Sequence, residues 1–416
     1  MSMMKHKILI ISLILLISFS SVLSNSYVLS AYGNSSYQNA NAPKIPEDYI
    51  IKNVPYVSQE TMFYCSYAVA TMVFKYYGVN TSLYEVLYNS GIGHSLIYIN
   101  NGFIGSYLLS QTNSDRNFLA TVYGLSHQSW YPNADGMTKE DKWEVYWNGV
   151  KENISDDIPV ITSVDPYTIP YLREKLNPSN NQTHYAHGFV IVGFNETNET
   201  VCYNDPAAGI WNDDVNGTYV YTSKEIFRNA VENTTGPKYF IESFTDQPSS
   251  PPLPKDKIFE MAHERNIKKM RGDLEFYSDF KLPLFPKLGV NAAEAFKRDL
   301  RIGSIHRISN VILYGLTATD QLINIYLPIS IEKYNVSQYL LENENLTLIC
   351  KHDYALLKKE SNCWKNMTIF VLELSQIGKD NSFIKKLIKS IPITEKIRKE
   401  LNKIISIEKT IIKSVV

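Results

Sequence analysis

Cysteine is scarce in this chain, since its 416 residues include only four, Cys65, Cys202, Cys350 and Cys363. So few thiols exclude a disulfide scaffold. An excess of either charge is also lacking: 41 basic residues oppose 42 acidic ones, and the net charge of -1 argues against nucleic acid as a general partner. Beyond the N-terminus, no apolar run reaches the roughly 20 residues that a membrane span requires. The composition, 44% hydrophobic and 20% charged, is that of a globular protein with room for two cores.

The N-terminus has the features of an export signal. Lys5 and Lys7 precede an apolar and serine-containing run over residues 8–23. This predicts a signal peptide over residues 1–24, with an uncleaved anchor as the alternative, and a spacer rich in Ser, Asn, Tyr and Ala over residues 25–46. We therefore expect a secreted protein or one at the extracytoplasmic cell surface, and a glycoprotein because Asn-x-Ser/Thr acceptors are frequent. These acceptors are Asn34, Asn80, Asn153, Asn181, Asn195, Asn198, Asn216, Asn233, Asn335, Asn345 and Asn366.

The rest of the chain divides at a proline-rich segment over residues 247–254, which predicts a linker. Before it, helical and strand patterns mix over residues 47–246, and after it residues 255–416 are mainly helical in pattern. The expected fold class is therefore α+β followed by a helical domain. The last segment, Ser382 to Val416, alternates Lys with Ile and Leu. A solvated helix face explains this pattern best, and association with a cell surface stays open as the alternative.

Cys65 stands where a helix is expected to begin. From Ser66 to Tyr77 no residue interrupts a helix, and Gly78 ends it. A thiol at a helix N-terminus has a lowered pKa, because the positive end of the helix favours the thiolate. Gln59, six residues earlier, is placed to donate its side-chain amide toward a developing oxyanion together with the backbone N–H of Cys65.

The other cysteines have simpler explanations. Cys350 and Cys363 lie close together in the C-terminal part and are the expected disulfide pair. Cys202 lies in an apolar strand, where a buried and inert thiol is expected. Cys65 is thereby left unpaired in an exported chain, and this calls for a chemical explanation.

Two predicted strands supply partners for that thiol. His187 opens the strand that ends at Phe194, and Asp205 follows the next strand, Val201 to Asn204. In an antiparallel hairpin these two ends lie on the same side. Asp205 can then orient the imidazole of His187, which can act as the base beside a nucleophile. The four residues Gln59, Cys65, His187 and Asp205 are therefore the candidate catalytic set.

Each of these residues alone has an ordinary structural explanation, and only their order and spacing point to catalysis. His94 and His127 are weaker candidates for the base, because neither heads a strand with an acidic partner downstream. His184 and His187 resemble a zinc pair, but no further ligand cluster follows. We therefore predict neither a metal nor a cofactor.

These residues resemble those of papain-like cysteine peptidases, in particular the bacteriocin-processing, double-glycine leader peptidases and their soluble relatives. The matching elements are Val54 to Gln59, the helix from Cys65 to Gly78, the strand His187 to Gly193, and Asn204 to Gly209. The resemblance implies a papain-like fold, with an N-terminal helix packed on an antiparallel sheet. It also implies Cys65 as nucleophile, His187 as base, Asp205 as orienter and Gln59 in the oxyanion hole. One departure is Ser66-Tyr67, where the family usually has Gly and Pro.

A second resemblance rests on shorter motifs. Residues around Gly91, Pro159, Asp165 to Tyr171 and the His187 strand are similar in order to the butirosin biosynthesis protein H family. That resemblance implies the same fold used for acyl transfer from a carrier-protein thioester to an amine. Such carrier proteins are cytoplasmic, so an exported enzyme would not meet them.

The sequence therefore predicts a secreted thiol peptidase or amidase that acts on a peptide or amide substrate through an acyl-enzyme. An acyltransferase with the same triad is the alternative, and a non-catalytic cell-surface binding protein on the same scaffold is a third hypothesis. Substrate identity, oligomeric state and the role of the C-terminal domain are left open by the residues.

Overall fold

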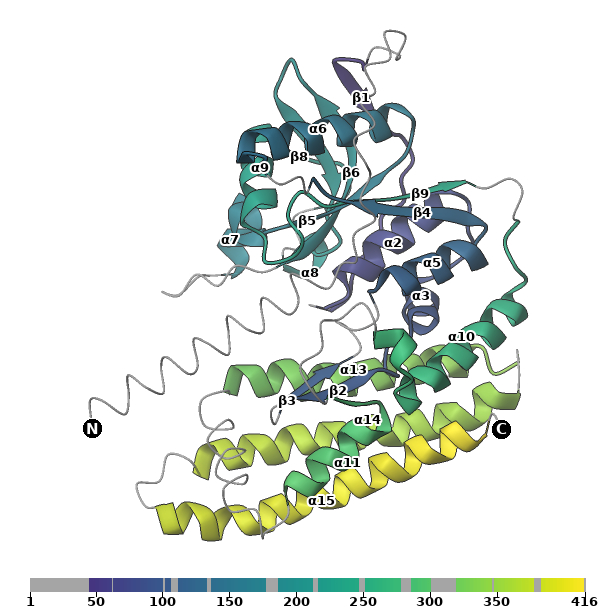
Figure 1. Cartoon of the computed structure of the whole chain (residues 1–416), viewed down its shortest axis with the longest axis vertical. Helices are drawn as coiled ribbons and strands as arrows, with labels where there is room; N and C mark the ends of the chain where they lie inside the picture. The colour runs from purple at the N-terminus through teal and green to yellow at the C-terminus, as the bar shows by residue number, and fades with distance from the viewer. Residues whose placement is uncertain are drawn as a thin grey trace. The chain divides into compact units, whose positions relative to one another are not determined.

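The computed structural model describes residues 45–61, 63–99, 102–105, 111–132, 136–176, 186–211, 216–246, 251–277, 286–300, 319–345, 348–377 and 383–414. These residues form two compact units, drawn in Figure 1. Unit 1 contains the described residues up to Leu83 and those of Arg116–Pro252. Unit 2 contains those of Tyr84–Asp115, Leu253–Ser278 and Leu282–Val416. The predicted continuous domain over residues 47–246 differs from this division, because Tyr84–Asp115 pack with the C-terminal helices.

Unit 1 is built on an antiparallel sheet, in which seven strands are found among the described residues. Its order is β4-β9-β5-β6-β7-β8, and β1 also pairs with β6. The strands are β1 (Asp48–Ile50), β4 (Leu125–Trp130), β5 (Val160–Val164), β6 (His187–Asn195), β7 (Thr200–Asn204), β8 (Val220–Ser223) and β9 (Ile241–Asp246). Every residue of β5 is buried, including the polar Thr162 and Ser163.

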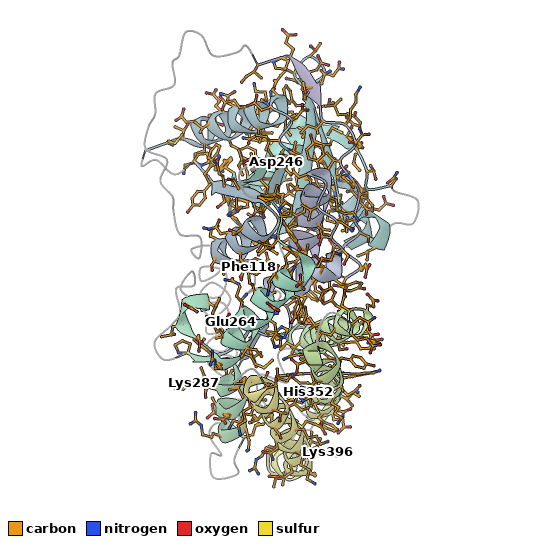
Figure 2. The ribbon with its side chains drawn as sticks, turned by 90° about the vertical axis from the view of Figure 1, so that its right-hand side faces the viewer. Phe118, Asp246, Glu264, Lys287, His352 and Lys396 are labelled. Atoms are coloured by element: carbon orange, nitrogen blue, oxygen red, sulfur yellow. The ribbon has the colours of Figure 1, made fainter. Side chains whose placement is uncertain are left out.

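Some helices of unit 1 have side-chain caps at their N-termini. The helices of this unit are α2 (Cys65–Tyr76), α5 (Asn113–Val122), α6 (Lys139–Ser155), α7 (Pro170–Leu176), α8 (Ala208–Trp211) and α9 (Lys224–Asn233), with a 3-10 turn η1 (Pro166–Thr168). Thr138 and Asp141 form a capping box at α6, and the Ser223 side chain accepts the Ile226 N–H at α9. In Figure 2, Phe118 marks α5 and Asp246 marks the end of β9.

The centre of the sheet holds α2 close to β6. A Cβ on Gly188 would lie 3.5 Å from Val69 Cγ2 and 3.7 Å from the Cys65 carbonyl carbon. These are ordinary van der Waals distances, so the first turn of α2 packs directly on the beginning of β6. Further along, Phe189 stacks on Tyr203 with ring centroids 4.2 Å apart, which links β6 to β7. The N-terminal helix on an antiparallel sheet confirms the predicted fold class.

Unit 2 is mainly helical, as expected. Its elements are α3 (Leu83–Ser90), β2 (Leu96–Ile99), β3 (Gly102–Gly105), α10 (Lys255–Arg271), η2 (Leu274–Tyr277), β10 (Lys287–Leu288), α11 (Val290–Asp299), α13 (Thr319–Glu342), α14 (Leu348–Ile377) and α15 (Phe383–Lys413). The three long helices α13, α14 and α15 lie side by side in Figure 1, and β10, β2 and β3 form a small antiparallel sheet. In Figure 2, Glu264 marks α10, His352 marks α14 and Lys396 marks α15.

The basic C-terminal segment has an inward apolar face in unit 2. Ile397, Leu401 and Ile404 of α15 are fully buried in a core that also contains Trp364 of α14. The lysines described on α15 after Pro392 are exposed. The alternation of Lys with Ile and Leu is thus explained by packing on one side and solvent on the other.

The expected disulfide between Cys350 and Cys363 is wrong, because Cys363 is a free, buried thiol. Both residues lie in the single helix α14, 13 residues apart. At a rise of 1.5 Å per residue their backbones are about 20 Å apart, whereas a disulfide needs Cα atoms within about 7 Å. The two cysteines are near in sequence but far apart in space, because both belong to one continuous helix.

Several predictions concern residues outside the described part of the chain. These are the signal peptide over residues 1–24, most of the spacer over 25–46, the first half of the linker, and His184. Within the described part, no helix combines the length and apolar character needed to cross a bilayer.

Candidate active site

Cys65 is the first residue of α2, and it is half-buried. The residue before it, Tyr64, provides no side-chain cap for the helix. The amide groups of a first helical turn have no partner within the helix, so an uncapped turn can receive an anion. The thiol thus lies at a place that stabilises negative charge on sulfur, as its sequence position predicts.

His187 and Asp205 meet beside this helix. Because β6 and β7 pair antiparallel, with Val190 opposite Asn204, the start of β6 and the residue after β7 lie at one end of the hairpin. His187 Nε2 lies 2.7 Å from Asp205 Oδ1, and both side chains are buried. The other ring nitrogen, Nδ1, is left for the hydrogen bond that joins His187 to Cys65. The structure therefore brings Cys65, His187 and Asp205 into one hydrogen-bonded series.

The electrostatics favour an ion pair between sulfur and imidazole. Burial acts to raise the pKa of the Cys65 thiol, but the hydrogen bond and charge of His187 and the backbone N–H groups of Gly188 and Ser66 hold that pKa below its usual value. Burial likewise acts to lower the pKa of His187, and the charge and hydrogen bond of Asp205, followed by Cys65, raise it to about 10. The thiol loses its proton more easily and the imidazole keeps its own, which is the thiolate–imidazolium state.

Asp205 is held by more than His187. Tyr171 of α7 donates its hydroxyl to Asp205 Oδ2, and the Ala207 N–H donates to Asp205 Oδ1 over 2.8 Å. The Asp205 N–H donates to the Gly217 carbonyl over 2.8 Å. A Cβ at Gly217 would lie 2.2 Å from the Asp205 carbonyl oxygen, so only glycine allows this approach. The carboxylate is therefore fixed behind the imidazole ring.

Gln59 is fully buried in the loop that leads to Cys65. Its backbone N–H donates to the Pro206 carbonyl over 3.0 Å, which ties this loop to the segment after Asp205. Its side-chain Nε2 donates to the Thr61 carbonyl over 2.7 Å. One amide hydrogen of Gln59 is thus used to shape the loop, which leaves the second amide hydrogen for another acceptor.

The two spare histidines have other surroundings. His94 belongs to unit 2, where it is buried with Nδ1 2.9 Å from the Ile92 carbonyl. Burial, followed by the charge of Lys333, holds the pKa of His94 well below its usual value. His127 of β4 lies with Nε2 3.0 Å from Glu242 Oε1. His187 is the histidine that the structure joins to Cys65.

Sequence reasoning missed three polar residues around the site: Tyr171, Arg116 and Glu242. Tyr171 was noted only as part of a motif, without a partner. Arg116 Nε lies 3.1 Å from Glu242 Oε1, and both side chains are buried. Glu242 did carry a signal, because it alternates with Phe240 and Phe244. A charged residue on such an apolar face of a strand indicates a buried partner of opposite charge. Arg116 carried no comparable signal.

The fold and this arrangement define a papain-like cysteine peptidase fold in unit 1. Residues 51–238 match the Peptidase_C39 like family, so this part of the chain is related to the C39-type cysteine peptidases. The matched residues include Gln59, Cys65, His187 and Asp205. No curated protein matches the chain.

Proposed function

We propose that the protein is a cysteine peptidase or amidase that uses Cys65, His187 and Asp205 as a triad. The observation that carries the proposal is the hydrogen-bonded series from the half-buried thiol through His187 to the buried carboxylate. Catalysis requires that the nucleophilic atom be accessible to a substrate. His187 and Asp205 are buried, whereas Cys65 is only half-buried, so its sulfur is the atom that a substrate can reach.

In the proposed reaction, the Cys65 thiolate adds to the carbonyl carbon of a peptide or amide bond. A C–S bond forms, and the carbonyl electron pair moves to oxygen, where the Cys65 N–H and the second amide hydrogen of Gln59 stabilise it. When the carbonyl reforms, the C–N bond breaks, and the leaving nitrogen takes the proton of the His187 imidazolium. Neutral His187 then removes a proton from water, which attacks the thioester and frees the Cys65 thiolate. Asp205 stays ionised and orients the ring throughout.

The activated pair is tested by the pH dependence of alkylation with iodoacetamide. In the wild-type protein, the rate at Cys65 should rise at a pH below the usual thiol pKa, because His187 lowers that pKa. In His187→Ala, burial remains and the hydrogen bond and charge are gone, so the rising limb should move to higher pH. Equal profiles in both proteins would contradict the triad. Cys65→Ala is the control for labelling elsewhere.

Acyl transfer is the alternative, since it shares the acyl-enzyme step and differs in the group that attacks the thioester. Product analysis with a panel of peptides and added primary amines separates the two. Hydrolysis should outpace transfer at every amine concentration if the protein is a peptidase. A third hypothesis, a binding protein without catalysis, predicts no turnover of any peptide and an undiminished biological effect for Cys65→Ala.

We also propose that the protein acts outside the cytoplasm, either secreted or at the cell surface. The basis is the N-terminal pattern of Lys5, Lys7 and the apolar run over residues 8–23. Sequencing of the mature N-terminus should find a start near residue 25. An intact Met1 in a cytoplasmic fraction would contradict export.

A further inference from the structure

The surroundings of Ser66 assign a role to Arg116. Arg116 lies in the first turn of α5 with a 3% exposed fraction. A buried arginine must be paired, and its partners show which part of the structure it holds. These partners lie in β9 on one side and in the first turn of α2 on the other.

On the first side, Arg116 is anchored by a buried carboxylate. Its Nε lies 3.1 Å from Glu242 Oε1. Burial acts to raise the pKa of Glu242, but the charge of Arg116 and then the hydrogen bond of His127 hold it below its usual value. Glu242 is therefore an ionised anchor in the sheet, and the guanidinium has a fixed position.

On the second side, the same guanidinium reaches the residue after the nucleophile. Arg116 Nη2 donates to the Ser66 carbonyl over 3.0 Å and also to the Ser66 hydroxyl. The guanidinium carbon lies 5.8 Å from the centre of the Tyr67 ring. These contacts hold Ser66 and Tyr67, the two positions where this chain departs from the usual Gly and Pro.

Ser66 matters because its backbone N–H donates to the Cys65 sulfur, together with that of Gly188. A shift of this turn would move the sulfur and the Cys65 N–H relative to Gln59. The hydrogen bond and then the charge of His187 lower the pKa of Cys65. Arg116 contacts Ser66 and Tyr67 on this side, so its contribution to the site is one of position.

We infer that Arg116 is a positioning residue that bridges Glu242 and Ser66 and holds the first turn of α2 in the geometry needed to stabilise an oxyanion. The Ser66 carbonyl and the Ser66 hydroxyl both accept from it. This inference rests on the proposed function, because it concerns the acylation of Cys65. It predicts a larger defect in reactions that form an oxyanion than in reactions that do not.

Two reagents separate these reactions. With p-nitrophenyl acetate, the Cys65 thiolate adds to the ester carbonyl, the carbonyl electron pair moves to oxygen and returns, and the C–O bond breaks to release p-nitrophenolate and leave an acetyl thioester. With iodoacetamide, the sulfur displaces iodide directly, and no oxyanion forms. The ratio of the two rates at Cys65 therefore reports on oxyanion geometry, whereas loss of folded protein lowers both rates together.

The variants are Arg116→Lys, which keeps the charge and loses the planar fork, and Ser66→Ala, which loses only the receiving hydroxyl. Acylation should fall about 10-fold to 100-fold in Arg116→Lys, and about 10-fold in Ser66→Ala. Alkylation should change much less than acylation in both, because His187 still lowers the pKa of Cys65. The double variant should lose no more than Arg116→Lys alone, because the two residues act through one contact. Ser223→Ala, which removes the cap of α9, is the control for a general loss of stability and should keep both rates.

The inference is overturned if acylation is unchanged in Ser66→Ala and Arg116→Lys, or if acylation and alkylation fall by the same factor. Should Arg116→Lys fail to fold, Ser66→Ala with its single lost hydroxyl decides the question. A wild-type protein without a p-nitrophenolate burst and without fast alkylation contradicts the proposed function itself. A wild-type burst with unaffected variants contradicts only the role of Arg116.

Discussion

Cys65 in unit 1 and Cys363 in unit 2 are both free thiols, yet their environments shift their pKa values in opposite directions. Cys65 faces the imidazole of His187, and its pKa falls despite burial. Cys363 is buried beside the Glu400 carboxylate, and burial followed by this carboxylate raises its pKa to about 12. Burial acts to raise the pKa of both thiols, so the neighbouring groups account for the opposite directions of the two shifts.

The two units also use buried charges differently. In unit 1, the pair of His187 and Asp205 ends at a half-buried thiol. In unit 2, Lys333 lies 2.8 Å from Glu360 and 3.4 Å from Glu408, and all three are buried. Burial and the neighbouring Glu360 raise the pKa of Glu408 to about 8, although Lys333 opposes this. The first set serves chemistry in our proposal, and the second joins α13, α14 and α15.

The sharpest test of the thiol comparison is competitive alkylation at pH 7. Cys65 should react at least about 1,000-fold faster than Cys363, because the thiolate fraction of a thiol drops tenfold for each unit by which its pKa rises. Cys202 should also stay unlabelled, since burial raises its pKa to about 11. Peptide mapping by mass spectrometry after timed iodoacetamide treatment gives the three rates. Comparable labelling of Cys363 in the folded protein would refute the comparison.

Lys333→Met should produce the largest loss of stability. It leaves Glu360 and Glu408 buried without their cation, and breaking such a set costs about 3–5 kcal/mol. Denaturant unfolding measures the loss. The control is Lys409→Met, because Lys409 lies 2.6 Å from Glu294 at the surface and an exposed pair contributes at most about 1 kcal/mol. Equal losses in both variants would show that burial of the Lys333 cluster has no special cost.

Asp205→Asn should slow acylation by p-nitrophenyl acetate about 100-fold, because it removes the group that orients His187. The charge of Asp205 raises the pKa of His187 to about 10, and burial opposes it. Without that charge, His187 should lose its proton at lower pH. The pH at which the acylation rate falls should therefore shift from near pH 10 to a lower pH. An unchanged pH would argue that Asp205 does not raise the pKa of His187.

Tyr171→Phe should have the smallest effect. It removes one hydroxyl that donates to the buried Asp205 carboxylate, and a hydrogen bond to a charged group contributes about 1.5–3 kcal/mol. Thermal unfolding measures this loss against Tyr334→Phe, which changes a side chain 47% exposed in unit 2. If the two variants unfold alike, the Tyr171 contact makes no net contribution.

Much of the fold could be predicted from local pattern. The helix at Cys65 follows from an uninterrupted run that Gly78 ends, and the helical character of residues 255–416 follows from their pattern. The disulfide prediction failed because proximity in sequence says nothing of distance along a helix. The assignment of Tyr84–Asp115 to unit 2 was also missed, because packing partners far away in sequence leave no local signal.

The residues of the candidate site likewise include some that the sequence predicted and some that it did not. Cys65, His187 and Asp205 were recognisable because each stands at the end of an element, where side-chain direction follows from hairpin and helix geometry, and Gln59 because it precedes Cys65 by six residues. Tyr171 and Arg116 were not, because their partners lie 34 and 50 residues away and depend on how α7 and α5 pack.

The amino-acid sequence by itself determined several elements of unit 1, the order of its reactive residues and the pairing of His187 with Cys65, since periodicity, turns and hairpin geometry act within a few residues. Only the tertiary structure decided other pairs, such as Glu400 beside Cys363 and Arg116 beside Ser66. Electrostatic effects on a thiol fall off over a few ångströms, so they depend on packing between distant segments.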